Sequence, residues 1–91
     1  MDNRYDEAIQ NYKKAIYINP DDEAAFNNLG IAFDKIGNYE QAIQSYQKAI
    51  EINSDNGTYY IGMGLAYQEL NNQAKADECF EIARSLSHKG K

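Results

Sequence analysis

Apolar residues recur at intervals of three and four positions along the chain, in five runs separated by short polar turns. In the first run Tyr5, Ala8, Ile9 and Tyr12 share this spacing, which places them on a single face of a helix. The remaining positions of each run are mostly polar or charged, as expected for helices that cover a core on one side. The pattern predicts helices over residues 5–18, 22–35, 39–52, 57–70 and 73–86.

The predicted turns hold residues that end one helix and start the next. Pro20 cannot continue the helical hydrogen-bond ladder, and it disfavours helical angles at Asn19. Asp21 or Asp22 can then cap the second helix, because a carboxylate oxygen accepts hydrogen bonds from the amides of a helix N-terminus. Gly37 marks a tight turn before the third helix.

The same pattern returns after 34 positions: Ala8 aligns with Ala42 and Ala76, and Gly30 aligns with Gly64. A fixed period of this size is the signature of stacked repeats. Gly30 and Gly64 lie mid-helix, where glycine costs about 1 kcal/mol relative to alanine. We therefore expect both glycines to let the next helix approach closely at Ala42 or Ala76. Other aligned sets are Tyr5 with Tyr39, Tyr12 with Tyr46 and Phe80, Ala15 with Ala49 and Ala83, Phe26 with Tyr60, and Phe33 with Tyr67.

This period divides the chain into repeats that form one domain, because a single helix pair cannot hide its own apolar face and must stack on the next. The predicted domain is residues 3–87, made of a half repeat with only a second helix (3–22), a full repeat (23–56) and a second full repeat (57–88), with tails at 1–2 and 89–91.

The last predicted helix, over residues 73–86, is polar at positions where the two helices that align with it, over residues 5–18 and 39–52, are apolar. Asp77 and Arg84 stand where the aligned positions of earlier copies hold isoleucine. A terminal repeat needs a polar outer face because nothing stacks on it, so we interpret residues 73–86 as a C-terminal cap.

The first helix, over residues 5–18, has no partner helix before it. We expect Ala8, Tyr12 and Ala15 to lack part of the cover that their aligned residues have. Two alternatives follow: the chain is a piece of a longer protein that supplies the missing helix, or this apolar edge pairs with another copy.

The composition excludes several classes of partner and cofactor. The net charge of −5 and pI of about 4.7 argue against nucleic acid, whose phosphates require cationic groups. Cys79 is the single cysteine, so no internal disulfide forms, and His88 is the single histidine, so we expect no metal site or other cofactor. No apolar run approaches the roughly 20 residues of a membrane span, and residues 1–10 hold no signal-peptide core. Cytoplasmic location without a membrane partner is the default expectation.

A 34-residue helix–turn–helix unit with aromatic, Leu, Gly, aromatic, then Ala, aromatic, Ala resembles the tetratricopeptide repeat. The resemblance implies an all-α fold of antiparallel helix pairs stacked in a right-handed α-α superhelix. It also implies a non-catalytic module that binds a protein or peptide in its concave groove. The matching residues are Phe26, Leu29, Gly30, Phe33, Ala42, Tyr46 and Ala49, then Tyr60, Met63, Gly64, Tyr67, Ala76, Phe80 and Ala83, with Ala8, Tyr12, Ala15 and Pro20 in the half repeat.

In this family the first helix of each pair lines the concave face. The amides of Asn27 and Asn28 can bond the backbone of an extended ligand. Ile31 and Leu65 lie off the core stripe and can contact its side chains, and Gly62 would let a backbone come close. Carried over by position, the groove candidates are Ala24, Asn27, Asn28, Ile31, Lys35, Thr58, Ile61, Gly62, Leu65 and Glu69.

One subfamily holds acidic C-termini with a two-carboxylate clamp of Lys, Asn and Arg. Asn28 matches the clamp asparagine, but Thr58 and Gly62 occupy the places where basic residues should follow. The resemblance therefore does not extend to this ligand.

Two further expectations complete the interpretation. Carboxylates are scattered around the helices instead of converging on a pocket, so we expect no enzyme, and Tyr17 and Tyr59 are expected on a solvated outer face. The alternative function is self-assembly, in which the edge of helix 5–18 forms a homodimer or higher oligomer.

Overall fold

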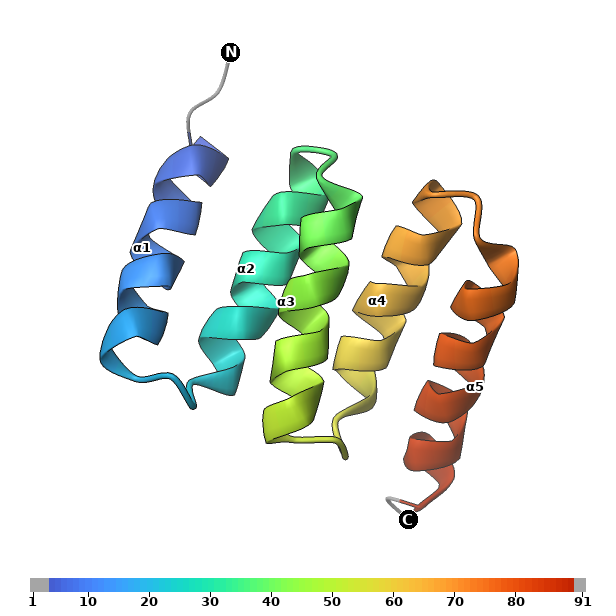
Figure 1. Ribbon diagram of the computed structural model, residues 1–91. Coiled ribbons are helices and arrows are strands. Elements are labelled where there is room, and N and C mark those ends of the chain that lie inside the picture. Colours follow the sequence, from blue (N-terminus) through green and yellow to red (C-terminus); the bar gives the residue numbers. More distant parts are fainter. Residues whose placement is uncertain (1–3, 90–91) are drawn as a thin grey trace.

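The computed structural model describes residues 4–89 and shows five helices that lie side by side in chain order (Figure 1). Successive helices are antiparallel, and each packs mainly against its neighbours in sequence, while α2 also touches α4. This is the all-α repeat architecture that the 34-residue period predicts. The helices are α1 (Arg4–Ile18), α2 (Glu23–Lys35), α3 (Tyr39–Ile52), α4 (Gly57–Glu69) and α5 (Gln73–Lys89).

The predicted helix boundaries agree with the observed ones to within one residue except at the C-terminus. There α5 continues past residue 86 to Lys89, because Ser87 and His88 include no helix breaker. The helix therefore extends three residues beyond the predicted range of 73–86. Residues 1–3 and 90–91 lie outside the described part of the chain.

Two turns end a helix with a residue in the left-handed conformation: Gly37 has φ 82° and Asn71 has φ 62°. After α2 the amide of Asn38 donates to the carbonyl of Phe33 (2.9 Å), and the amide of Gly37 donates to the carbonyl of Asp34 (3.0 Å). The corresponding two bonds after α4 are both 2.9 Å long. These paired bonds form the Schellman motif, which satisfies the last carbonyls of each helix.

The alternate turns start helices with capping side chains. Before α2, the carboxylate of Asp22 accepts a hydrogen bond from the amide of Ala25 (3.1 Å). Before α4, the side-chain oxygen of Asn56 accepts from the amide of Thr58 (3.0 Å). The sequence had left Asp21 and Asp22 as alternative caps of α2, and the residue that caps the helix is Asp22.

Alanines at the helix crossings let the backbones pack closely. Ala42, Ala49, Ala66 and Ala76 are all 0% exposed. Larger side chains fill the space around them, because interiors are packed nearly as densely as organic crystals. The buried cluster also contains Ile9, Leu29, Ala32, Phe33, Ile43, Tyr46, Met63 and Cys79.

Tyr46 of α3 packs between glycines of two other helices. A Cβ at Gly30 of α2 or at Gly62 of α4 would lie 2.8 or 2.7 Å from its ring. Gly64 stands in the same relation to Phe80, with a Cβ only 2.6 Å from that ring. The mid-helix glycines therefore make room for aromatic rings, whereas the sequence had suggested that they make room for neighbouring alanines.

Tyr59 corrects the prediction of an outer-face position, since it is only 4% exposed. Its hydroxyl donates to Glu23 Oε2 at 2.6 Å, and Asn53 Nδ2 donates to the same oxygen at 3.1 Å. A buried phenol needs such a partner, and this one lies across the repeat boundary, where local sequence pattern does not reveal it. Tyr17 is 89% exposed, as expected.

Candidate partner-binding site

Each first helix presents two opposite sides. At 3.6 residues per turn, Asn28, Ile31 and Lys35 follow one stripe of α2, whereas Phe26 and Phe33 follow the stripe on the other side. The same division repeats on α4. The two helices touch each other, and we call the ten predicted residues on their outward stripes the α2–α4 face.

Three large apolar side chains of the α2–α4 face are open to solvent. Ile31 is 41% exposed, Ile61 47% and Leu65 48%. This confirms that these positions lie off the core stripe. Single exposed apolar residues are ordinary, whereas several on the outward stripes of two touching helices make this face a candidate for contact with a partner.

The predicted residues of α2 meet the first helix. Asn28 and Ile31 line a hollow of about 210 Å³ together with Tyr5, Ala8 and Tyr12 of α1. The sequence did not place α1 in the candidate site, because the family resemblance assigns the concave face to the first helix of each pair.

The predicted residues of α4 meet the last helix in a similar way. Thr58 and Ile61 line a hollow of about 260 Å³ with Ala83 and Leu86 of α5. Four of the ten candidates therefore line two separate hollows, and each hollow is completed by a helix that the sequence prediction had omitted.

As predicted, three residues of α1 are covered less than the residues of α3 that align with them. Ala8, Tyr12 and Ala15 are half-buried, whereas the three aligned residues of α3 are buried. The difference arises because α2 covers those residues of α3 and no described helix takes the same place on α1.

One end of the α2–α4 face is acidic. Partial burial raises the pKa of Asp34, an effect that the Lys35 ammonium opposes and the Glu69 carboxylate reinforces. Partial burial, the charge of Glu69 and a hydrogen bond to Glu69 raise the pKa of Tyr39, with a smaller contribution from Asp34. Two carboxylates thus share this end with one lysine, which disfavours an acidic ligand there.

Gly62 and Asn27 are the least accessible candidates, since both are half-buried. The Cβ that Gly62 lacks would meet the ring of Tyr46 at 2.7 Å. Packing inside the chain therefore accounts for this glycine, and the close approach of a ligand backbone is not needed to explain it.

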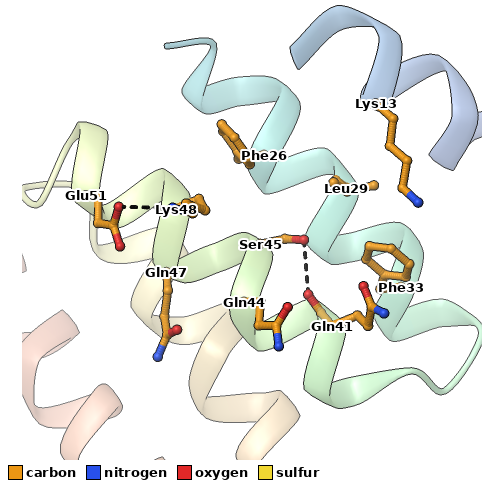
Figure 2. A pocket seen from close by; sticks show the side chains of 10 residues that line it. All are labelled: Lys13, Phe26, Leu29, Phe33, Gln41, Gln44, Ser45, Gln47, Lys48 and Glu51. Atoms are coloured by element: carbon orange, nitrogen blue, oxygen red, sulfur yellow. Dashed lines mark hydrogen bonds and ion pairs between the residues drawn. The ribbon is translucent and has the colours of Figure 1, made fainter. Parts of the chain in front are cut away.

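A further hollow lies on the other side of α2, where the sequence analysis identified no site (Figure 2). Its volume is about 360 Å³, and its floor is Phe26, Leu29 and Phe33. We call this hollow the α1–α3 groove, because Lys13 of α1 lies on one side and residues of α3 lie on the other. The lining residues of α3 are Gln41, Gln44, Ser45, Gln47, Lys48 and Glu51. The sequence signal that was missed is a change of charge between aligned residues of the two repeats.

Within residues 4–89, no three His, Cys, Asp or Glu side chains are grouped so that they could hold a metal ion. Burial and the charge of Glu78 raise the pKa of the Cys79 thiol, against a smaller opposite effect of Lys75, so the reactive thiolate is disfavoured. In the same range no helix has the length and apolar character required to cross a membrane.

Family models match the chain in three stretches. The tetratricopeptide repeat model matches residues 23–56, a second model of that description matches 57–87, and a TPR repeat model matches 2–37. No match was found among curated proteins.

Solved structures share the fold over nearly the whole chain. One MamA structure has a TM-score of 0.92 at 29% identity and covers 94% of this chain and 50% of that chain. Another has a TM-score of 0.94 at 24% identity, with coverages of 97% and 51%. The second TPR of Spaghetti (RPAP3), bound to the HSP90 peptide SRMEEVD, has a TM-score of 0.87 at 25% identity and covers 91% of this chain and 77% of that chain. This chain thus spans about half the length of the MamA chains.

Proposed function

The chain belongs to the tetratricopeptide-repeat family, and from this premise we propose that it is a non-catalytic adaptor that binds a protein segment on the α2–α4 face. The observation that carries the proposal is the solvent exposure of Ile31, Ile61 and Leu65, at 41–48%, on the outward stripes of two helices that touch each other. Burying these side chains against a partner is favourable because it removes apolar area from water.

The polar residues of the face suit an extended ligand. The exposed amide of Asn28 supplies a donor and an acceptor for a peptide backbone. The hollows beside Ile31 and Ile61 then receive ligand side chains. Two repeats offer a short binding surface, so we expect micromolar affinity for an isolated peptide, on the order of −8 kcal/mol.

The ligand of the Spaghetti repeat is not carried over to this chain. That protein is bound to a peptide with two adjacent glutamates near its end. Here Thr58 and Gly62 stand where a carboxylate clamp would need cations, and Glu69 adds negative charge to the face.

A paired pull-down from a lysate of the source organism tests the proposal. One bait is the wild-type chain and the other carries Asn28→Asp with Leu65→Glu. Both positions are exposed, so the core should stay intact. A protein that is retained by the wild type and lost by the double variant is the expected result.

The matched control is a bait with Ala74→Glu and Ser85→Glu, two exposed positions on α5. It adds the same charge away from the face and should keep the partner. Proteins that are held equally by all three baits would place binding elsewhere and contradict the proposal.

Self-association is the second candidate function, and the half-buried residues Ala8, Tyr12 and Ala15 favour it. A second copy that covers them would complete the packing that α2 gives to α3. A stable dimer needs about 1,000 Å² or more of buried surface, so the contact must extend beyond these three residues.

Sedimentation equilibrium over a hundredfold range of concentration separates the two functions. Self-association predicts a mass that rises with concentration and falls back to the monomer in Ala8→Arg. A wild-type chain that stays monomeric at every concentration would eliminate this candidate and leave the adaptor function untouched.

A further inference from the structure

The α1–α3 groove is separate from the α2–α4 face, because the two lie on opposite stripes of α2. Its floor is apolar: Leu29 and Phe33 are buried, while Phe26 is half-buried. A hollow of about 360 Å³ falls within the range of roughly 300–1,000 Å³ that is typical of ligand sites.

Ser45 is the smallest of the α3 side chains that line the groove. Its hydroxyl donates to the carbonyl of Gln41 at 3.0 Å (Figure 2), so this buried polar group is satisfied within the helix. A small side chain at this point takes up little of the hollow that Ser45 lines together with Phe26, Leu29 and Phe33.

The groove carries positive charge in an acidic protein. Lys13 Nζ stands 5.9 Å from the centroid of the Phe33 ring, within reach of a cation–π interaction. Lys48 Nζ lies 3.6 Å from Glu51 Oε1, but both side chains are more than 60% exposed, so the pair is weak. Two lysines against one glutamate give this groove a formal charge of +1, whereas the whole chain carries −5.

The second repeat provides an internal comparison. Shifting by 34 residues replaces Gln44 and Gln47, which line the groove, by Glu78 and Glu81. The aligned set of groove positions then holds Lys75 against these two glutamates, for a formal charge of −1. The amides of the first repeat can donate hydrogen bonds to a carboxylate, whereas the glutamates of the second would repel it.

The floor differs between the repeats as well. Phe26 and Phe33 align with Tyr60 and Tyr67, so the first repeat has the more apolar floor. An apolar floor below cations and amide donors is suited to a ligand with a large apolar side chain between acidic ones.

We propose that the α1–α3 groove binds an acidic segment of a partner protein that inserts one aromatic side chain. The ring packs on Phe26 and Phe33. Flanking carboxylates approach Lys13 and Lys48, and the Gln44 amide donates a further hydrogen bond. This site goes beyond the adaptor function of the α2–α4 face and would allow the chain to hold two partners on opposite sides.

The test uses a defined probe, the acetylated and amidated peptide Glu-Glu-Phe-Glu-Glu, titrated into the ¹⁵N-labelled chain at low salt and followed by NMR. Amide signals around Lys13, Phe33 and Ser45 should shift with a saturable dependence on peptide. Signals that shift instead along Asn28, Ile31 and Ile61, or no saturable shift at millimolar peptide, would overturn the proposal. The α2–α4 adaptor function would survive either of these outcomes.

Two variants test whether the probe binds in the groove itself or responds only to the net charge of the chain. Gln44→Glu with Gln47→Glu copies the second repeat at exposed positions and should weaken probe binding by about tenfold or more, as like charges replace donors. Ala74→Glu with Ser85→Glu adds the same charge on α5 and should bind as the wild type does. Equal weakening in both variants would mean that net charge alone drives binding, and circular dichroism verifies that each variant is folded.

Two altered probes measure separately how much the carboxylates and the aromatic ring of the peptide contribute to binding. Glu-Glu-Ala-Glu-Glu and Lys-Lys-Phe-Lys-Lys should each bind about tenfold more weakly than the original probe, and raising the salt concentration should weaken the original probe. If either altered peptide binds the wild-type groove as tightly as the original, the proposed recognition is wrong.

Discussion

Gly57 and Gly62 lie in one helix but face different neighbours. A Cβ on Gly62 would stand 2.7 Å from the buried ring of Tyr46, whereas a Cβ on Gly57 would find its nearest neighbour, the Ala83 carbonyl, at 3.4 Å. The first distance requires the ring to move, and the second is close to ordinary van der Waals contact. The same residue type therefore has a packing role at one position and none of comparable strength at the other.

We predict that Gly62→Ala lowers the free energy of unfolding by about 1–3 kcal/mol, because displacing a buried ring outweighs the gain of about 1 kcal/mol from alanine in a helix. Gly57→Ala should change it by less than about 0.5 kcal/mol. Urea titrations of both variants measure the difference, and equal effects would contradict this assignment of roles.

Glu23 accepts hydrogen bonds from Asn53, at the end of its own repeat, and from Tyr59 of the next repeat. Tyr59→Phe removes the shorter bond and should lower the free energy of unfolding by about 1–2 kcal/mol. Tyr17→Phe is the control, since Tyr17 is 89% exposed and its loss should change little. If the two substitutions have the same effect in urea, the Tyr59 hydroxyl does not stabilise the fold.

At the element scale, the turns that follow α2 and α4 use the same hydrogen bonds with different residues. Gly37 and Asn71 both have positive φ, and no described atom beyond its chain neighbours lies within 4 Å of where a Cβ at Gly37 would stand. Backbone conformation alone therefore sets the cost of a side chain at Gly37.

These turns give opposite predictions. Gly37→Ala should lower the free energy of unfolding by about 1 kcal/mol, because alanine is strained at positive φ. Asn71→Gly should raise it by up to about 1 kcal/mol, because glycine adopts this conformation without a steric cost. Thermal unfolding followed by circular dichroism compares both with the wild type, and a loss of stability in Asn71→Gly would show that its side chain matters more than its backbone angle.

At the scale of the whole molecule, two buried phenols link stability to alkaline pH. Burial, with the nearby Asp34 charge, raises the pKa of Tyr46 to about 12, and burial with the Glu23 hydrogen bond and charge raises that of Tyr59 to about 12. A raised pKa in the folded state means that the unfolded chain loses these protons first, near pH 10.

The stabilisation from both phenols should thus be fully present below pH 10 and decline as the pH rises from 10 to 12. Urea midpoints measured from pH 8 to 12 should fall over that window, and the fall should be smaller in Tyr59→Phe, which has one such group fewer. A variant that shows the same pH dependence as the wild type would exclude Tyr59 as a source of it.

The sequence alone determined the helices, the repeat and the family. Helical hydrogen bonds join residues four apart, and the core stripe follows the same local spacing, so the positions of α1 to α5 could be read from the pattern of apolar residues. The exposure of Ile31, Ile61 and Leu65 was predicted for the same reason, because a residue off the stripe of its own helix faces away from the core.

Only the tertiary structure decided which distant groups meet. Tyr59 and Glu23 are 36 residues apart, and Tyr46 packs against glycines of two other helices, so neither burial follows from the period of one helix. The split of the α2–α4 face into two hollows and the presence of the α1–α3 groove depend likewise on how α1, α3 and α5 stand beside the first helices. Those positions result from packing between helices, which the spacing of residues along one helix does not specify.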